Sequence, residues 1–372
     1  MYARVTRVTG DFHYVVPVRQ VDTAEELWDL DGNVLATLSE DEETLGVQGG
    51  NDDEDDEPEP RDMGWSPDGI GLTYLLQDPA PDSTEAEPEE GEEEAGRGRN
   101  GRMDKVIKWV PPFGEEDKTV LYEQRTRMSW HRFDPDMGIL FANEGRGGNA
   151  EVFAVFLDDP EEKHVIYEHD SDDFYENPGS LMTVRDGGGG GGFRGSFGRG
   201  GGGAPGGSGS KIQISADGSS VFLQGTQYNE DPMEVAPMAF IDRVDIRSAE
   251  KTRIYEADND GVYERILTPV DLEAGRFVVS RESPTEVAQS YLKEGDASTQ
   301  ITNNQNYTPD LANAERHTFM IRRTDGFEYR VMVTLPESFR PGTPLPAMFW
   351  FYPREYISQE NYLESLRTYN KN

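Results

Sequence analysis

The sequence contains no cysteine and no long apolar run. Without cysteine there can be no disulfide, no thiolate nucleophile and no zinc–thiolate site. Apolar residues make up only 35% of the 372 residues. No stretch of about 18 apolar residues occurs, so neither a transmembrane helix nor a membrane partner is expected. The opening "MYARVTRVTGDFHYV" also lacks the apolar core of a signal peptide. These absences predict a soluble protein and leave the compartment open between cytoplasm and periplasm.

Positive charge is also scarce. The chain has 35 Lys and Arg against 72 Asp and Glu, a formal net charge of −37. Phosphate binding needs a basic surface, so nucleic acid is not expected as a main partner. Part of the imbalance is local, because residues 40–62 hold twelve acidic residues and residues 82–94 hold eight. Such runs repel themselves and are predicted to be solvated inserts.

One turn-and-strand pattern recurs along the chain. It reads "WSPDGIGLTYLLQ" from Trp65, "RFDPDMGILFANE" from Arg132 and "QISADGSSVFLQG" from Gln213, with a degenerate copy, "DLEAGRFVVSRE", from Asp271. Asp followed by Gly favours a tight turn, because Gly readily adopts a positive φ. The apolar run that follows each turn is typical of a strand.

A second pattern follows the first. "EVFAVFLDDPEEKHVIYE" (151–168) and "AFIDRVDIRSAEKTRIYE" (239–256) match closely, and shorter versions cover 290–304 and 26–40. The repeating unit is therefore four short antiparallel strands, spaced at roughly 45 to 80 residues once inserts are counted. This order predicts a mainly β fold, a partial β-propeller of four-stranded antiparallel blades. A β-sandwich with similar turns is the alternative. The tryptophans that we expect in the blade cores are Trp28, Trp65, Trp109 and Trp130.

A glycine-rich insert, residues 186–210, interrupts the third copy of the repeat. Its Arg-Gly steps are typical of some RNA-binding segments, and its many glycines are typical of phosphate-binding loops. The insert has only two arginines and no Gly-Lys-Ser/Thr, so a flexible linker between strands is favoured. No cofactor and no metal site are predicted.

The pattern changes near residue 313. Two alternating segments, 318–323 and 328–335, flank Asp325-Gly326, which is a strong hairpin signal. "AMFWFY" (347–352) is almost wholly apolar and predicts a strand covered on both faces. "SQENYLESLRTYN" predicts a helix that begins after Ser358 as N-cap. A hairpin, a buried strand and a helix are how an α/β-hydrolase domain begins.

Blades with "SPDG"-type turns, followed by "FMIRRTDGFEYRVMVTLPESFRPGTPLPAMFWFYPREY", resemble the prolyl oligopeptidase family of serine peptidases. The resemblance implies a propeller over residues 1–312 and the start of an α/β-hydrolase peptidase domain over 313–372. It implies hydrolysis of peptide bonds in short peptides, with the propeller limiting access. The nucleophile of the family lies in a Gly-x-Ser-x-Gly elbow, which does not follow this strand. The chain is therefore expected to be a fragment, inactive alone, whose Ser-His-Asp site lies beyond it.

The resemblance also implies one catalytic position. Tyr352, at the end of "PAMFWFY", matches the Tyr that donates its hydroxyl to the family's oxyanion hole. A structural Tyr packed beneath the sheet is the alternative. Arg354 and Glu355, which follow it, are expected to pair with each other or with the propeller rather than contact substrate.

The histidines are not expected to be catalytic. All five lie in the repeats or at the junction: His13, His131, His164, His169 and His317. His131, in "MSWHRF", is expected to make a structural hydrogen bond, with a place at the propeller mouth as the alternative.

Two other functions remain open at this point. One is a non-catalytic propeller that binds a protein partner, in which case "AMFWFY" would pack on the propeller or on that partner. The other is a different α/β-hydrolase, such as an esterase with a propeller cap.

Overall fold

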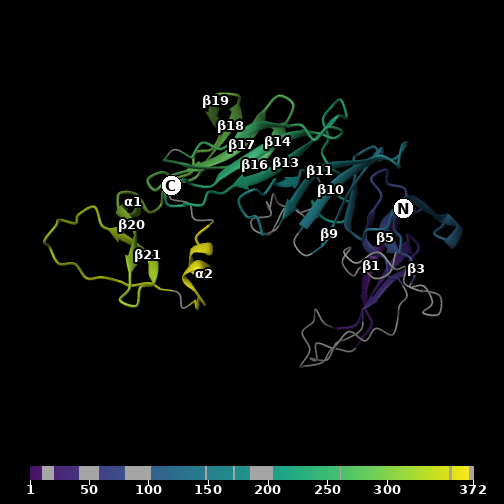
Figure 1. Cartoon of the computed structure of the whole chain (residues 1–372), viewed down its shortest axis with the longest axis horizontal. Helices are drawn as coiled ribbons and strands as arrows, with labels where there is room; N and C mark the ends of the chain where they lie inside the picture. The colour runs from purple at the N-terminus through teal and green to yellow at the C-terminus, as the bar shows by residue number, and fades with distance from the viewer. Residues whose placement is uncertain are drawn as a thin grey trace, which may run out of the picture.

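Antiparallel sheets make up almost all of the regular structure (Figure 1). The computed structural model describes residues 1–10, 21–41, 58–79, 102–146, 149–170, 172–184, 204–259, 261–351 and 354–367. Within them, the first sheet has three strands: β1 (Tyr2–Val8), β2 (Thr23–Asp29) and β3 (Val34–Asp41).

Four further sheets follow in chain order, each with four strands, and in each the strands pair in the order in which they occur along the chain. The second sheet comprises β4 (Arg61–Trp65), β5 (Leu72–Gln77), β6 (Asp104–Trp109) and β7 (Lys118–Gln124). The third comprises β8 (Met128–Phe133), β9 (Ile139–Arg146), β10 (Asn149–Phe156) and β11 (Lys163–Asp170). The fourth comprises β12 (Ser180–Leu181), β13 (Ser220–Gln227), β14 (Met238–Asp245) and β15 (Lys251–Glu256). The fifth comprises β16 (Tyr263–Asp271), β17 (Arg276–Glu282), β18 (Gln289–Glu294) and β19 (Ala297–Gln300).

The repeated turn motif precedes the second strand of each four-stranded sheet. In the second sheet, Ser66 Oγ donates to Asp68 Oδ1 at 2.7 Å, and Gly69 takes φ +74°. In the fourth, Ser215 Oγ donates to Asp217 Oδ1 at 2.5 Å, and Gly218 takes φ +73°. The third sheet has Met137 at this point, with φ +57°, a conformation that costs a side-chain-bearing residue more than it costs Gly. The turn geometry is thus kept even where the sequence departs from Gly.

Apolar clusters fill the space between successive sheets. One cluster joins Leu75 and Val106 of the second sheet to Phe133, Leu140 and Phe153 of the third. Similar clusters lie between the first and second, third and fourth, and fourth and fifth sheets. Sheets that pack face to face in succession are the arrangement of propeller blades, and the predicted mainly β, partial-propeller fold is confirmed.

The tryptophan predictions hold in part. Trp109 and Trp130 are buried in the clusters, at 8% and 2% exposure. Trp28 is half-buried, and its indole N–H donates to Glu26 at 2.9 Å. Trp65 was predicted as core and is exposed, because it lies at the end of β4, where the turn begins.

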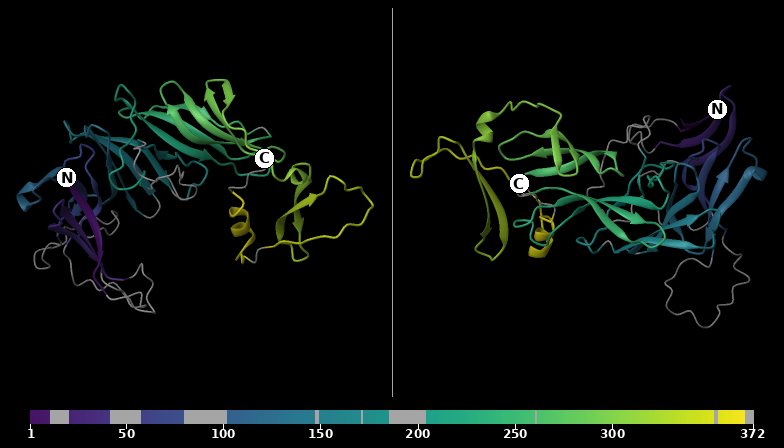
Figure 2. Two further views of the ribbon diagram at one scale, coloured as in Figure 1. Left: turned by 180° about the vertical axis from the view of Figure 1, so that it is seen from behind. Right: turned by 90° about the horizontal axis from the view of Figure 1, so that it is seen from above.

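After the fifth sheet come a short helix, α1 (Pro309–Ala312), and a hairpin of β20 (Glu315–Arg322) and β21 (Glu328–Leu335). The predicted Asp325-Gly326 turn joins the two strands, and Gly326 takes φ +94°. The predicted helix is also present as α2 (Gln359–Glu364), and Ser358 Oγ accepts from Asn361 N at 3.1 Å, as an N-cap should. Figure 2 shows the hairpin and α2 as a separate group beside the sheets.

The strand predicted at 347–352 is not observed. Residues 347–351 form no strand, and Met348 and Trp350 are 95% and 89% exposed. A strand needs a neighbour to satisfy its backbone groups, and none pairs with this segment in the described part of the chain. An apolar segment of this kind becomes a strand only where another strand pairs with it.

The inserts are described only at their edges. The acidic run 82–94 and most of 40–62 lie outside the described residues, as do residues 186–203 of the glycine-rich insert. Its last residues, 204–210, are described, and they are not a free linker, since Pro205 is buried. Among the residues that the structure describes, no helix is long and apolar enough to cross a bilayer.

Candidate functional site

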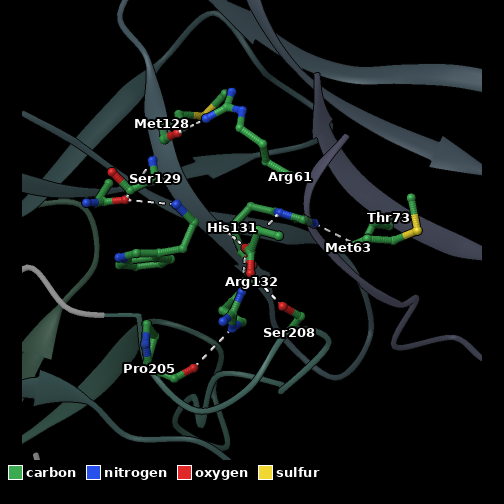
Figure 3. A network of polar contacts seen from close by, with 12 residues as sticks. Arg61, Met63, Thr73, Met128, Ser129, His131, Arg132, Pro205 and Ser208 are labelled. Carbon is green, nitrogen blue, oxygen red and sulfur yellow. Dashed lines mark hydrogen bonds and ion pairs between the residues drawn. The ribbon is translucent and has the colours of Figure 1, made fainter. Parts of the chain in front are cut away.

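Two β-bulges face each other where the second and third sheets meet. The pairing of β4 with β5 slips between Arg61 and Gly64, and that of β8 with β9 slips between Met128 and His131. A bulge leaves backbone groups without ladder partners and redirects the side chains beside it. Polar side chains gather at these two bulges and form a cluster (Figure 3).

Side chains bind the backbone groups that the bulges expose. Asp104 Oδ2 accepts from Met128 N at 2.7 Å, and Arg61 donates to both Asp104 Oδ1, at 2.5 Å, and Met128 O, at 2.8 Å. Asn143 Oδ1 accepts from the next two backbone amides of β8, at 3.2 and 3.1 Å. A buried amide without a partner is costly, so these contacts make the bulge of β8 a stable feature.

Asp62 is the centre of the cluster. It takes φ +51°, and its carboxylate contacts β8. Oδ2 accepts from the backbone amide of His131 and from Arg132 Nη1, each at 2.7 Å, and Oδ1 accepts from Ser208 Oγ at 2.7 Å. One carboxylate therefore joins β4, β8 and the end of the glycine-rich insert.

His131 lies between Asp62 and Thr73. Its Nδ1 is 3.2 Å from Asp62 Oδ2, in a geometry poor for a hydrogen bond, and its Nε2 is 3.0 Å from Thr73 Oγ1. The order Asp–His–hydroxyl is that of a catalytic triad. However, His131 is 3% exposed and Thr73 only 1%, so no substrate carbonyl can approach the hydroxyl. The prediction of a structural role for His131 is supported, and we assign it no catalytic step.

Asp62 and His131 differ in charge, because the shifts in their pKa values favour an ionised carboxylate and a neutral imidazole. Burial alone would raise the pKa of Asp62, but the nearby imidazole and backbone amide of His131 and the charge of Arg132 outweigh it and lower the pKa to about 2. Burial lowers the pKa of His131, against the pull of Asp62. A neutral imidazole whose Nε2 accepts from the Thr73 hydroxyl fits this arrangement.

Arg132 joins the cluster to the segment of residues 204–212, which we term the crossing segment. Its side chain is 1% exposed, and its Nε donates to Pro205 O at 3.0 Å. Further on, Ile212 N donates to Phe133 O at 2.7 Å. The segment also lies against Gly64, where an added Cβ would be 2.4 Å from the amide nitrogen of Gly209. The cluster is therefore a joint between three segments far apart in sequence.

Sequence reasoning identified His131 but missed its partners. Asp62 stands at the end of a long acidic run, where nothing distinguishes it from its neighbours. Arg132 adjoins His131 in a strand in which every residue except Ser129 is buried, and a charged residue between His131 and Phe133 was the signal that could have identified it.

Tyr352, the predicted oxyanion-hole donor, lies outside the described residues. Arg354 and Glu355 are exposed, and the guanidinium of Arg354 lies 5.5 Å from the ring centre of Tyr356. In the described ranges, no group of three or more His, Asp or Glu side chains is arranged to hold a metal ion.

No model of a known protein family matches the chain. It is 22% identical over 384 aligned positions to a probable glutamyl endopeptidase, chloroplastic, of Oryza sativa subsp. japonica, which covers 96% of this chain and 36% of that protein. It is 28% identical over 209 positions to the protein of the same name from Arabidopsis thaliana, covering 53% of this chain and 20% of that protein. The chain thus spans about a third or less of the length of these relatives.

Several solved structures are also similar. Oligopeptidase B from Trypanosoma brucei with bound antipain has a TM-score of 0.40 and 11% identity, covering 92% of this chain and 38% of that one. A prolyl endopeptidase has a TM-score of 0.33 and 12% identity, covering 86% and 44%. The β-propeller domain of the Trilobed protease from Pyrococcus furiosus has a TM-score of 0.30 and 11% identity, covering 75% and 70%. At these TM-scores the likenesses are loose, and they position no residue of this chain. Both relatives are named as peptidases, which agrees with the predicted resemblance to a peptidase family.

Proposed function

We propose that this chain is the propeller-bearing part of a serine peptidase that hydrolyses peptide bonds in short peptides. The observation that carries the proposal is the order of its units. Four-stranded sheets in succession are followed by an Asp-Gly hairpin and a capped helix, in a chain that aligns over 96% of its length with a probable glutamyl endopeptidase.

We propose a division into a propeller, residues 1–312, and the beginning of an α/β-hydrolase domain, residues 313–372. The last strand of the fifth sheet ends at Gln300, and the hairpin begins at Glu315. Arg316 Nη1 donates across the boundary to Pro284 O at 2.8 Å.

The catalytic Ser, His and Asp would then lie in the part of the relatives that this chain does not span. In this proposal the propeller limits entry to short peptides, and Tyr352 donates its hydroxyl to the oxyanion of the tetrahedral intermediate. In a longer polypeptide, Tyr352→Phe should lower kcat/KM by about 100-fold with little change in KM, the usual effect of losing one such donor. An unchanged kcat/KM would assign Tyr352 a packing role instead.

The first test is to read the encoding gene beyond the codon for Asn372. A frame that continues through a Gly-x-Ser-x-Gly elbow and later Asp and His codons supports the proposal. The longer protein and the present chain are then assayed on peptides with Glu or Pro before the scissile bond, and on matched esters. Activity in the longer protein alone is the expected result, and a longer protein that cleaves only esters would make it an esterase.

A non-catalytic interaction module is less well supported. It requires the apolar segment 347–352 to pack on the propeller or on a partner. Phe349 and Trp350 are 85% and 89% exposed, so these two side chains do not pack on the propeller, and a partner would have to cover them. Such an apolar surface suits a segment that further strands of the same domain would cover.

A further inference from the structure

An aromatic cluster stands beside the fourth sheet. Phe174 and Tyr175 belong to the loop between β11 and β12, and Tyr228 follows β13. The rings of Phe174 and Tyr228 stack at 4.6 Å with an interplanar angle of 26°, and Tyr175 meets Phe174 edge-on at 5.5 Å. We refer to these three rings as the aromatic platform.

The platform is held in a fixed shape. Asp173 Oδ1 accepts from the amides of Tyr175 and Glu176, each at 3.2 Å, which closes a turn beneath the rings. Gln227 Nε2 donates to Tyr175 O at 2.8 Å and ties the loop to the end of β13. Binding to a rigid platform costs little ordering of the loop.

A cation occupies this platform. The guanidinium carbon of Arg367 lies 5.2 Å from the ring centre of Phe174 and 5.8 Å from that of Tyr175. Its Nη2 also donates to Glu364 Oε1 at 3.1 Å. Arg367 follows α2, so this contact joins the C-terminal group to a sheet that precedes it by more than a hundred residues. In the views of Figures 1 and 2, α2 lies between the β20–β21 hairpin and the sheets.

The surroundings of the platform favour a positive group. The loop reads "DSDDFYE" from Asp170, and four of these seven residues are acidic. The faces of aromatic rings carry negative electrostatic potential and attract guanidinium, the more so when the contact is partly shielded from water. Arg367 has 32% of its side chain exposed.

The rest of the C-terminal group binds α2 from the other side. Gln359 exchanges hydrogen bonds with the backbone of Glu328 in β21, at 2.7 and 3.0 Å, and Tyr362 OH accepts from Arg330 N at 2.8 Å. The helix is therefore attached to the hairpin by several hydrogen bonds and to the platform by one side chain.

We propose that the aromatic platform is the docking site for Arg367 and that this contact is a latch between the C-terminal group and the propeller. A single, partly exposed cation–π contact opens at low cost, whereas the hydrogen bonds of α2 to β21 persist. The hairpin and α2 then move together when the latch opens, about the remaining hydrogen bond from Arg316 to Pro284 O. This proposal does not depend on peptidase activity.

The absence of native cysteine allows a direct test in the full chain. Cysteines replacing the exposed Glu176 and Glu360 carry spin labels, and the distance distribution between them is measured by pulsed electron paramagnetic resonance. Arg367→Ala should raise the population of open, long-distance states by about threefold to tenfold, the range for a partly exposed cation–π contact. Arg367→Lys should give an intermediate distribution, because an ammonium covers less of the rings.

Arg354→Ala is the matched control, since Arg354 makes a cation–π contact with Tyr356 rather than with the platform. Phe174→Leu removes the platform without altering α2, so it should reproduce Arg367→Ala, and the double variant should add nothing further. Circular dichroism checks that each variant keeps its sheets. A distribution unchanged in both Arg367→Ala and Phe174→Leu would overturn the proposal.

Discussion

His131 and Asp62 tie the stability of the chain to pH through a single buried contact. The pKa of His131 is lowered, so the unfolded chain takes up this proton below its ordinary value of 6.5 while the folded chain resists it. The contribution of His131 to the stability of the folded chain is thus full above pH 6.5 and is lost as the pH falls below that value. The pKa of Asp62 is lowered to about 2, so its contribution is full above 3.8 and lost as the pH falls toward 2.

Replacing His131 should therefore weaken the dependence of the free energy of unfolding on pH below about 6.5. In His131→Gln, the free energy of unfolding should decline less steeply as the pH falls below 6.5 than in the wild type, since the proton uptake is absent. Chemical denaturation at a series of pH values measures this slope. His317→Gln is the control, because His317 is exposed. Equal slopes in all three proteins would contradict the role of His131 in this pH dependence. The pKa of His169 is also lowered by burial, so a residual slope remains in each protein.

The close approach of the crossing segment to Gly64 leaves no room for a side chain. Gly64→Ala places a Cβ 2.4 Å from a backbone nitrogen, which cannot move aside as a flexible side chain can. We expect a loss of about 1–3 kcal/mol in the free energy of unfolding, the usual cost of overpacking. Gly207→Ala, in the crossing segment itself, is the matched control, since its Cβ would meet nothing within 4 Å. Equal stabilities of the two variants would show that the segment does not press on β4.

Among the secondary-structure elements, α2 depends on the edge of β21. Gln359→Ala removes both hydrogen bonds to the backbone of Glu328. These contacts are exposed, so we expect a loss of about 1 kcal/mol, seen as faster hydrogen exchange of the Glu328 amide. Leu363→Ala tests the same helix without these bonds and should leave that amide unchanged. Slow exchange in Gln359→Ala would mean that another group protects the edge.

The elements that could be predicted are those whose cause is local. The Asp-Gly turn of the β20–β21 hairpin and the Ser358 cap depend on residues within a few positions, and both are confirmed. The segment 347–351 could not be predicted, because a strand depends on neighbours that sequence periodicity does not supply. The docking of the crossing segment was missed for a similar reason. Asp62 and Ser208 are 146 positions apart, and no local pattern links them.

For the whole molecule, the net charge of −37 is the dominant electrostatic fact. Like charges repel more strongly in the compact state than in the expanded chain, and salt screens this repulsion. We expect the thermal midpoint to rise as NaCl increases from about 0.05 to 0.5 M, where the Debye length falls below about 5 Å. Replacing the six acidic residues 52–57 by their amides should reduce this rise. A midpoint independent of salt would mean that this repulsion does not destabilise the folded chain.

The crossing segment also sets an order of events during synthesis. Strands β4 and β8 are synthesised long before Pro205 and Ser208. Pro205, which Arg132 binds, is translated some seventy residues after it, and Ser208, which Asp62 binds, more than a hundred residues after it. Until residue 212 emerges, the second and third sheets can contact each other through Asp62 and Arg132, but the hydrogen bonds to Pro205 and Ser208 cannot form. The second and third sheets are thus synthesised before the crossing segment, and the hydrogen bonds of that segment are added to them later.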